Sequence, residues 1–381
     1  MTDIQQQVQE TIDTLVESGV ERGLQVAVYR NGELVVDAVA GLADAETKRP
    51  VTSDTPFYST STGKGITTTV AHVLVERGVL KYDTPVAELW PEFAANGKES
   101  ATVRHVLTHA TGVPGLPADT TPEDLANWDK MVAVIADATP WWEPGTKFGY
   151  HAQTYGYLVG ELVRRATGKT ISEALREYVA VPLGLERELF FGVPESELAR
   201  TATLEEVQNP DAGGGEEFTP EMLAEIPFFK VVHGYTAAPM AALPGAEFGN
   251  RNDILTSDIP AGGTFSARAL AKVYAALLGE VGGVRLVSPE RLRTMTAEAV
   301  SGDDEILGFP TARGLGYDIG LPSPTAAPAP TVFGTAGSEG SAAFADTASK
   351  VTFALTKNRV TQGDYSAVDR VHETVVKALG L

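Results

Sequence analysis

The sequence predicts an α+β fold, α/β in the broad sense, in which an antiparallel sheet is flanked by helices and carries an inserted, mainly helical domain. Segments with strand character lie near both ends of the chain, and short turns join them, which favours antiparallel pairing. The middle of the chain has mostly helical periodicity, interrupted by Pro and Gly. We therefore assign residues 1–80 and 281–381 to the sheet domain and residues 81–280 to the inserted helical domain. A functional site is expected in the cleft between them.

The individual elements follow from periodicity and from turn residues. Asn31-Gly32 separates two strand-like segments and is typical of a type I′ hairpin turn, and Gly78 ends the helix that follows Ser61. Residues 205–250 are irregular, and a loop of that length is usually functional or mobile. The expected elements are helices over 4–15, 61–77, 155–167, 172–179, 266–279 and 366–379, and strands over 24–29, 34–40, 314–319, 341–345 and 351–356.

Composition and charge exclude several classes of function. The formal net charge is -20 and the pI is about 4.7, so the surface repels nucleic acid and anionic membranes. The chain has no Cys, which excludes disulfides, thiolate catalysis and cysteine metal sites. The first residues lack the pattern of a secretory signal, and no run of about 18 apolar residues occurs. We expect a cytoplasmic protein with a small-molecule substrate and no nucleic-acid or membrane partner. The oligomeric state stays open.

Ser61-Thr62-Gly63-Lys64 is the one S-x-x-K sequence of the chain and lies at the start of a predicted helix. Residues three apart share a helix face, so the Lys64 amine can reach the Ser61 hydroxyl. A serine hydroxyl is a weak nucleophile that needs an adjacent base. Burial and the positive end of a helix would lower the lysine pKa toward that role. A helix N-cap followed by a solvated lysine is the other interpretation of this tetrapeptide.

The blocks around this motif form an ordered series: FYSTSTGK over 57–64, VLTHATGVP over 106–114 and PGTKFGY over 144–150. The series resembles the penicillin-recognising serine hydrolases, in the class C β-lactamase-like branch, and most closely its family VIII carboxylesterases. The resemblance extends from about residue 10 to the end of the chain. It implies the β-lactamase/DD-peptidase-like fold and a reaction that needs no cofactor.

The resemblance also implies roles for three residues: Ser61 as nucleophile, Lys64 as its base, and Tyr150 as the tyrosine of a Y-x-N element. A tyrosine with an ordinary pKa of about 10 exchanges protons near neutrality only if a cation stabilises its phenolate. Lys64 is the candidate cation, and the two groups would titrate as a pair. A core aromatic residue that opens the next helix is the alternative for Tyr150.

The third family element is K-T-G, or H-x-G or W-x-G in esterase members, and Thr335-Ala336-Gly337-Ser338 stands in its place. Gly337 would let the backbone approach the substrate. The N–H groups of Ser61 and Ser338 are the predicted oxyanion donors. A glycine-rich turn that enters a strand is the alternative interpretation.

Two departures from the family pattern favour esters over β-lactams or peptides. Thr335 replaces the lysine that would meet a β-lactam carboxylate. Ala152 replaces the asparagine of Y-x-N, whose amide usually holds a lactam or peptide side-chain carbonyl. The net charge of -20 points the same way, because it disfavours an anionic substrate.

Several further side chains are candidates for substrate contact. Trp141, Phe228 and Phe229 could form the acyl or alcohol pocket or could close the core. His151 could orient Tyr150, although neighbours in sequence rarely share a face and a structural role is open. His105 and His109 lie four apart without an acidic ligand in a zinc pattern, so we expect them to cap and pack, and we expect no metal.

The sequence thus predicts a serine carboxylesterase for short acyl chains that forms an acyl-enzyme on Ser61. A β-lactamase or D-amino-acid/DD-peptidase, and an acyltransferase with an acceptor other than water, are the alternative enzymes. A catalytically inactive binding protein on the same fold is an alternative of another class. No G-x-S-x-G occurs, so the nucleophile elbow of α/β-hydrolases is absent.

Overall fold

The computed structural model describes residues 3–206, 226–320 and 328–381. Residues 207–225 of the irregular segment expected over 205–250 lie outside the described residues. Within the described ranges, no helix is both long and apolar enough to span a bilayer.

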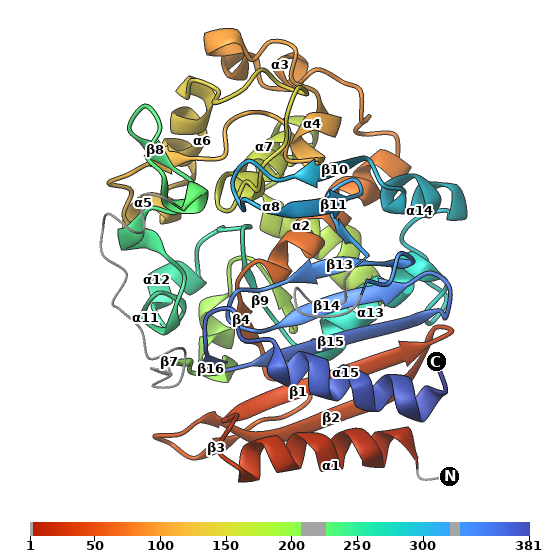
Figure 1. Ribbon diagram of the computed structural model, residues 1–381. Coiled ribbons are helices and arrows are strands. Elements are labelled where there is room, and N and C mark those ends of the chain that lie inside the picture. The colour runs from red at the N-terminus through yellow and green to blue at the C-terminus, as the bar shows by residue number, and fades with distance from the viewer. Residues whose placement is uncertain (1–2, 207–225, 321–327) are drawn as a thin grey trace.

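Nine strands of the described chain form one antiparallel sheet, and it joins the two ends of the sequence (Figure 1). Strand β1 lies between β2 and β15, so Leu24 pairs with Ala40 on one side and with Lys357 on the other. The predicted antiparallel sheet built from both ends of the chain is therefore confirmed. In spatial order the strands are β10 (Val300–Asp303), β11 (Pro310–Arg313), β12 (Asp318–Ile319), β13 (Val332–Ala336), β14 (Ala342–Asp346), β15 (Val351–Lys357), β1 (Gly23–Arg30), β2 (Glu33–Asp44) and β3 (Arg49–Pro50).

Three smaller strand groups complete the pairing. Strand β4 (Phe57–Ser59) pairs with β9 (Gly263–Phe265), which also pairs with β6 (Leu189–Phe190). The other two groups are the pair β5 (Leu116–Pro117) with β8 (Tyr235–Thr236) and the parallel pair β7 (Glu205–Glu206) with β16 (Arg359–Val360).

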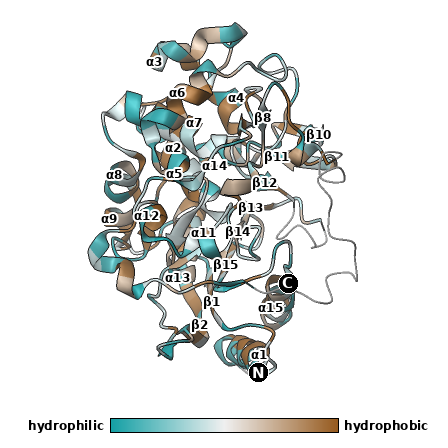
Figure 2. Ribbon diagram, turned by 90° about the vertical axis from the view of Figure 1, so that its left-hand side faces the viewer, coloured by the Kyte–Doolittle hydropathy of each residue, from teal (hydrophilic) through white to brown (hydrophobic). Residues whose placement is uncertain are grey.

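The two faces of the large sheet belong to two separate hydrophobic cores. On β1, Val26 and Val28 pack toward α1 (Ile4–Glu17) and α15 (Ser366–Leu379), whereas Ala27 and Tyr29 face the larger core. This alternation is the two-residue period of a strand. Both helices carry hydrophilic and hydrophobic segments in Figure 2, as expected of helices with one buried face. Helix α13 (Ala267–Leu278) covers the opposite face of the sheet.

Most of the remaining helices lie above β13 in Figure 1. Helix α13 lies inside the range 81–280 yet packs on β1 and β15; the domain boundaries at residues 80 and 280 stay a prediction. The other helices are α2 (Thr62–Glu76), α3 (Val86–Leu89), α4 (Val103–Leu107), α5 (Pro122–Ala126), α6 (Trp128–Asp137), α7 (Thr154–Thr167), α8 (Ile171–Leu175), α9 (Val181–Leu183), α11 (Ala246–Gly249), α12 (Asn252–Leu255) and α14 (Pro289–Thr296).

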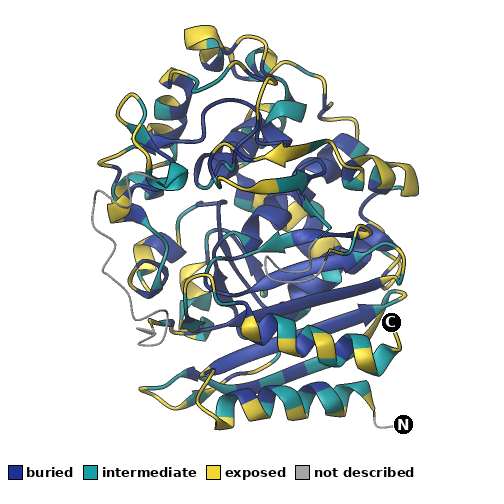
Figure 3. Cartoon of the chain, in the orientation of Figure 1, coloured by how far each residue is buried: buried dark blue, intermediate teal, exposed yellow. Residues whose placement is uncertain are grey.

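Local predictions near the N-terminus agree with the structure. Asn31 and Gly32 have φ of 52° and 83°, so both adopt the left-handed conformation that a type I′ turn requires. Ser61 is the N-cap of α2, and Gly78, with φ of 74°, follows the helix end. Helix α2 is buried from Thr62 to Val75, as its dark ribbon in Figure 3 shows.

One predicted strand differs from the observed element. Residues 314–319 were expected to be extended, but only Asp318–Ile319 form a strand, β12. Gly316 has φ of 87°, and a Cβ on it would lie 2.5 Å from the Tyr155 hydroxyl. The chain therefore turns at Gly314–Tyr317, because this segment passes close to buried side chains of α2 and α7.

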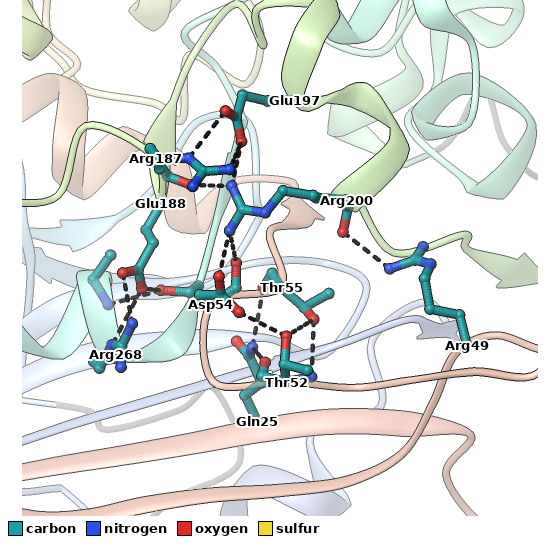
Figure 4. Close-up of polar contacts among 12 residues, drawn as sticks. Gln25, Arg49, Thr52, Asp54, Thr55, Arg187, Glu188, Glu197, Arg200 and Arg268 are labelled. Carbon is teal, nitrogen blue, oxygen red and sulfur yellow. Dashed lines mark hydrogen bonds and ion pairs between the residues drawn. The ribbon is translucent and has the colours of Figure 1, made fainter.

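An ion-pair cluster anchors the loop that leads into β4 and Ser61 (Figure 4). The Arg200 Nη2 group donates to the Asp54 backbone oxygen at 2.6 Å and to its carboxylate at 2.9 Å. The cluster borders a surface cavity of about 350 Å³. Arg187 and Arg268 pair with Glu197 and Glu188 in the same way. Since each of these arginines already contacts a carboxylate, the cluster is structural.

Candidate active site

The Ser61 hydroxyl lies where two elements meet. Strand β4 pairs with β9 and ends just before Ser61, which begins α2. A Cβ on Gly63 would lie 2.3 Å from the Gly262 backbone, so only a glycine allows α2 to approach the segment after α12 this closely. This approach brings the Ala261 carbonyl next to the first turn of α2.

Three side chains, which we call the Ser–Lys–Tyr cluster, share hydrogen bonds on one oxygen atom. The Lys64 Nζ donates to Ser61 Oγ at 2.9 Å, and the Tyr150 hydroxyl donates to the same Oγ at 2.6 Å. The Lys64 Nζ also lies 5.1 Å from the Tyr150 ring centroid. The structure therefore brings together all three residues of the sequence-based catalytic prediction.

Burial determines the protonation of Lys64. Its side chain is 3% exposed, and its second hydrogen bond goes to the Ala261 carbonyl at 3.1 Å. Burial lowers the pKa of Lys64 from an ordinary value of 10.5 to about 7, with Asp318 opposing this shift. A large fraction of Lys64 is therefore a neutral amine near neutral pH, the form that can accept a proton.

Tyr150 and Ser61 are both half-buried, so a substrate can reach them from solvent. Burial raises the pKa of Tyr150 above its ordinary value, and the hydrogen bond to Ser61 opposes the rise. Tyr150 is therefore a protonated phenol at neutral pH and can donate a proton.

The backbone of Tyr150 is held by a residue that the sequence did not reveal. Its N–H donates to Asp304 Oδ1 at 2.9 Å. The Asp304 carboxylate also pairs with Arg313, and the Arg313 guanidinium carbon lies 5.2 Å from the Tyr150 ring centroid. Asp304 and Arg313 lie more than 150 positions after Tyr150 in the chain, and neither belongs to a recognisable motif.

The segment Thr335-Ala336-Gly337-Ser338 lies at the end of β13, next to the start of α2. The Thr335 hydroxyl donates to the Thr62 carbonyl at 3.0 Å, which places β13 beside the first turn of α2. Thr335, Ala336 and Ser338 are half-buried, whereas Gly337 is buried. The segment therefore borders the Ser–Lys–Tyr cluster, as the proposed third element requires.

The predicted oxyanion donor on Ser338 has a partner in the structure. Its backbone N–H donates to Thr60 Oγ1 at 2.8 Å. Thr60 Oγ1 in turn contacts the buried Glu339 carboxylate, which also accepts from the Thr60 N–H at 3.2 Å. Glu339, which the sequence interpretation missed, thereby joins the residue before Ser61 to the turn that carries Ser338.

His151 points away from the Ser61 hydroxyl. Its ring nitrogens contact Thr111 Oγ1 at 2.8 Å and the Gly149 carbonyl at 2.6 Å. Its backbone N–H donates to His109 Nδ1 at 3.0 Å. The ring therefore braces the loop that ends in Tyr150. His109 stacks on Tyr155 with ring centroids 4.5 Å apart.

The aromatic pocket candidates are dispersed. The backbone N–H of Trp141 donates to the Gly112 carbonyl at 2.7 Å. Phe228 and Phe229 meet edge to face with ring centroids 5.2 Å apart. Within the part of the chain that the structure describes, no hydrogen bond or ring contact joins these three side chains to the Ser–Lys–Tyr cluster. Their role as a substrate pocket stays a prediction.

His105 completes a capping box with Thr102 at the start of α4, as expected of a capping residue. Groups of three His, Asp or Glu side chains able to hold a metal ion do not occur among residues 3–206, 226–320 and 328–381.

Comparison with characterised proteins places this geometry in a family context. The chain is 35% identical over 346 residues to the esterase/beta-lactamase LipL of Mycobacterium tuberculosis, covering 89% of this chain and 77% of LipL. It is 33% identical over 180 residues to the esterase EstB of Burkholderia gladioli, covering 43% of this chain and 45% of EstB.

Solved structures resemble the whole chain. A family VIII carboxylesterase superposes with a TM-score of 0.85 at 32% identity, covering 98% of this chain and 97% of the other. A penicillin-binding protein homologue from Caulobacter crescentus gives a TM-score of 0.82 at 34% identity, covering 99% and 98%. The predicted β-lactamase/DD-peptidase-like fold is confirmed.

The model of the beta-lactamase family matches residues 8–377, almost the entire chain. This range includes the S-x-x-K helix, Tyr150 and the segment 335–338. The chain therefore belongs to the beta-lactamase family and is a serine hydrolase of that family.

Proposed function

We propose that this chain hydrolyses neutral carboxylic esters with short acyl chains through an acyl-enzyme on Ser61. The observation that carries the proposal is the convergence of Lys64 Nζ and the Tyr150 hydroxyl on Ser61 Oγ, at 2.9 and 2.6 Å. A base and an acid on the nucleophile are what acyl transfer requires.

In the acylation step, Ser61 Oγ forms a bond to the ester carbonyl carbon while its proton passes to the neutral Lys64 amine. The Ser61 N–H at the start of α2 stabilises the negative oxygen of the tetrahedral intermediate. The Ser338 N–H, the second proposed donor, must exchange its hydrogen bond to Thr60 Oγ1 for one to that oxygen. The bond to the alcohol oxygen then breaks, and the Lys64–Tyr150 pair returns a proton to the leaving alkoxide. The enzyme is left with an ester bond on Ser61.

In deacylation the same groups act in reverse on water. The Lys64–Tyr150 pair accepts a proton from a water molecule as its oxygen attacks the acyl carbon. The bond to Ser61 Oγ breaks, and Ser61 takes the proton back. The free acid leaves, and the Ser–Lys–Tyr cluster returns to its starting state.

Two features support esters over β-lactams. Thr335 offers a hydroxyl where a lysine would pair with the lactam carboxylate, and Ala152 offers a methyl group in place of an amide. The nearby Arg313 does not replace that lysine, because it is buried between Asp304 and Asp318. The esterase names of LipL and EstB agree with this preference.

β-Lactam hydrolysis is a second candidate, because the name of LipL includes both activities. The test compares kcat/KM for p-nitrophenyl butyrate and for nitrocefin, with wild type and Ser61→Ala. We expect the ester to be preferred at least ~100-fold, since the site lacks a cation for the lactam carboxylate. Equal values would contradict the ester assignment. p-Nitrophenyl acetate and dodecanoate test the acyl-length preference.

Labelling tests the nucleophile directly. A fluorophosphonate should add one adduct to Ser61 in the wild-type protein and none to Ser61→Ala, as measured by mass spectrometry of peptides. An adduct on a different residue, or unchanged esterase activity of Ser61→Ala, would refute the proposed site.

A further inference from the structure

Arg313 is a buried cation beside the Ser–Lys–Tyr cluster. It lies at the end of β11, is 4% exposed, and places its guanidinium carbon 5.2 Å from the Tyr150 ring centroid. Its Nη2 group lies 3.3 Å from Asp304 Oδ2, and its Nη1 group donates to Asp318. Its Nε is buried and has no partner among the described residues. A buried arginine is costly unless carboxylates pair with it, and Asp304 and Asp318 do so here.

Asp304 connects this cation to the backbone of Tyr150. Asp304 Oδ1 accepts hydrogen bonds from three N–H groups, those of Tyr150 at 2.9 Å, Ile306 at 3.0 Å and Leu307 at 2.9 Å. Its other oxygen faces Arg313. The carboxylate thus holds the Tyr150 main chain while the guanidinium covers the Tyr150 ring, and both contacts come from the hairpin of β10 and β11.

We infer that Arg313 is a positioning residue of the reaction at Ser61: its guanidinium holds the Tyr150 ring against Ser61 and supplies a buried positive charge next to the Lys64–Tyr150 pair. The inference rests on the proposed function and names a group outside the three family motifs. A cation–π contact is stronger when the arginine is desolvated, so this contact favours one position of the Tyr150 ring.

The charge on Arg313 also acts on proton transfer. Burial is the main cause of the lowered pKa of Lys64, and Arg313 lowers it further. Arg313 likewise opposes the burial that raises the pKa of Tyr150. Asp318 raises the pKa of both Lys64 and Tyr150.

Other ionisable groups face the same region from each neighbouring element. They are Lys64 on α2, His109 after α4, His151 before α7, Tyr155 on α7, Asp304 after β10, Asp318 on β12 and Glu339 after β13. His109 and His151 are buried, and burial lowers the pKa of each well below that of free imidazole, so both are neutral near pH 7. Arg313 therefore lowers the pKa of both Lys64 and Tyr150, and Asp318 raises both. Glu339 also raises the pKa of Lys64, and Asp304 that of Tyr150.

A matched pair of variants tests the inference. Arg313→Met removes the positive charge and Asp318→Asn removes the negative one. In Arg313→Met the Oδ1 atom of Asp304 keeps its three backbone donors, but Oδ2 loses its guanidinium partner, so Arg313→Lys is included because it keeps a cation beside Asp304. The Asp318 side chain is 43% exposed. Circular dichroism and thermal unfolding establish that each variant is folded.

The measurement is the pH dependence of Ser61 labelling by a fluorophosphonate and of kcat/KM for p-nitrophenyl butyrate. The acidic limb of the pH profile is the range in which activity rises as Lys64 loses its proton. In Arg313→Met this limb should move to higher pH by about one unit, because the loss of a nearby positive charge raises the pKa of Lys64 by about that amount. In Asp318→Asn it should move to lower pH. Arg313→Lys should keep the limb of the wild type but lose rate, since an ammonium retains the charge without the planar contact.

Shifts of opposite sign support the inference. An unmoved limb in both variants, or shifts in the same direction, would overturn it and leave the proposed function intact. If Arg313→Met does not fold, Arg313→Lys carries the test: a loss of kcat/KM with an unmoved acidic limb supports the inference, and wild-type kcat/KM in Arg313→Lys overturns it. Failure of the proposed function is seen separately, as labelling that persists in Ser61→Ala.

Discussion

The Tyr150 hydroxyl donates a hydrogen bond to Ser61 Oγ at 2.6 Å, across 89 positions of sequence. The same oxygen accepts from Lys64, so one serine hydroxyl is the acceptor of both a tyrosine and a lysine. Because burial lowers the pKa of Lys64 to about 7, the lysine can exchange donor and acceptor roles with Ser61 near neutral pH.

Lys64→Met and Tyr150→Phe should each lower kcat/KM for p-nitrophenyl butyrate by at least ~100-fold, the effect of removing a positioned proton-transfer group. Lys81→Ala is the matched control, because Lys81 is exposed and lies outside the Ser–Lys–Tyr cluster. It should retain wild-type activity. A variant of Lys64 or Tyr150 with near-normal turnover would show that its assigned role is wrong.

The activity should depend on pH through Lys64. The active form is the neutral amine, and the pKa of Lys64 lies at about 7, below its ordinary value. kcat/KM should therefore be low at pH 5, rise through about pH 7 and level off above it. A profile that still rises through pH 9 would contradict a Lys64 pKa of about 7 in the active enzyme.

Glu339→Ala should reduce both stability and turnover. The substitution removes the acceptor of the buried Thr60 N–H and Thr60 hydroxyl, and an unsatisfied buried donor costs about 1–3 kcal/mol. We expect urea unfolding to show that loss, and kcat to fall more than KM rises, because Thr60 and Ser338 border the reacting oxygen. Glu99→Ala, at an exposed carboxylate, is the control and should change neither quantity. Wild-type stability of Glu339→Ala would exclude the structural role of this network.

Gly337→Ala should inactivate the protein without unfolding it. A Cβ at this position would lie 2.4 Å from the Glu339 carboxylate and 2.7 Å from Ser341 Oγ, so the turn that carries Ser338 must move. Gly279→Ala is the matched control, since Gly279 has extended backbone angles and open space around its Cβ position. Measurement of kcat and of the melting temperature for Gly337→Ala and Gly279→Ala checks this prediction. Equal activity in the two variants would contradict it.

Much of the fold was predictable because its local signals are strong. The Asn31-Gly32 turn allows a tight hairpin, and the helix after Ser61 has a defined end at Gly78. The segments 341–345 and 351–356 were expected as strands and form β14 and β15, shifted by one residue at most at each end. The strand predicted over residues 314–319 is the exception. The backbone there turns because Gly316 packs closely against α2 and α7, and a local sequence pattern does not reveal such contacts.

The site was predictable only where residues belong to ordered motifs. Ser61 and Lys64 share a helix face through their spacing, and Tyr150 was assigned from the resemblance. His151 had no such support, and its ring faces Thr111 and Gly149. Asp304, Arg313 and Glu339 were missed because an isolated charged residue in a sequence is most often solvated, and only burial distinguishes these three.

The amino-acid sequence by itself determined the family, the antiparallel sheet from both ends of the chain, and the lysine one helical turn from the serine. The family follows from the resemblance of the ordered motifs. The sheet and the position of the lysine follow from periodicity, turn residues and spacing, which act over a few positions. The tertiary structure decided that the Tyr150 hydroxyl reaches Ser61, that the Arg313 guanidinium lies over the Tyr150 ring, and that the Lys64 amine is buried away from water. These depend on desolvation and on contacts between distant segments, and such effects exist only after the chain has packed.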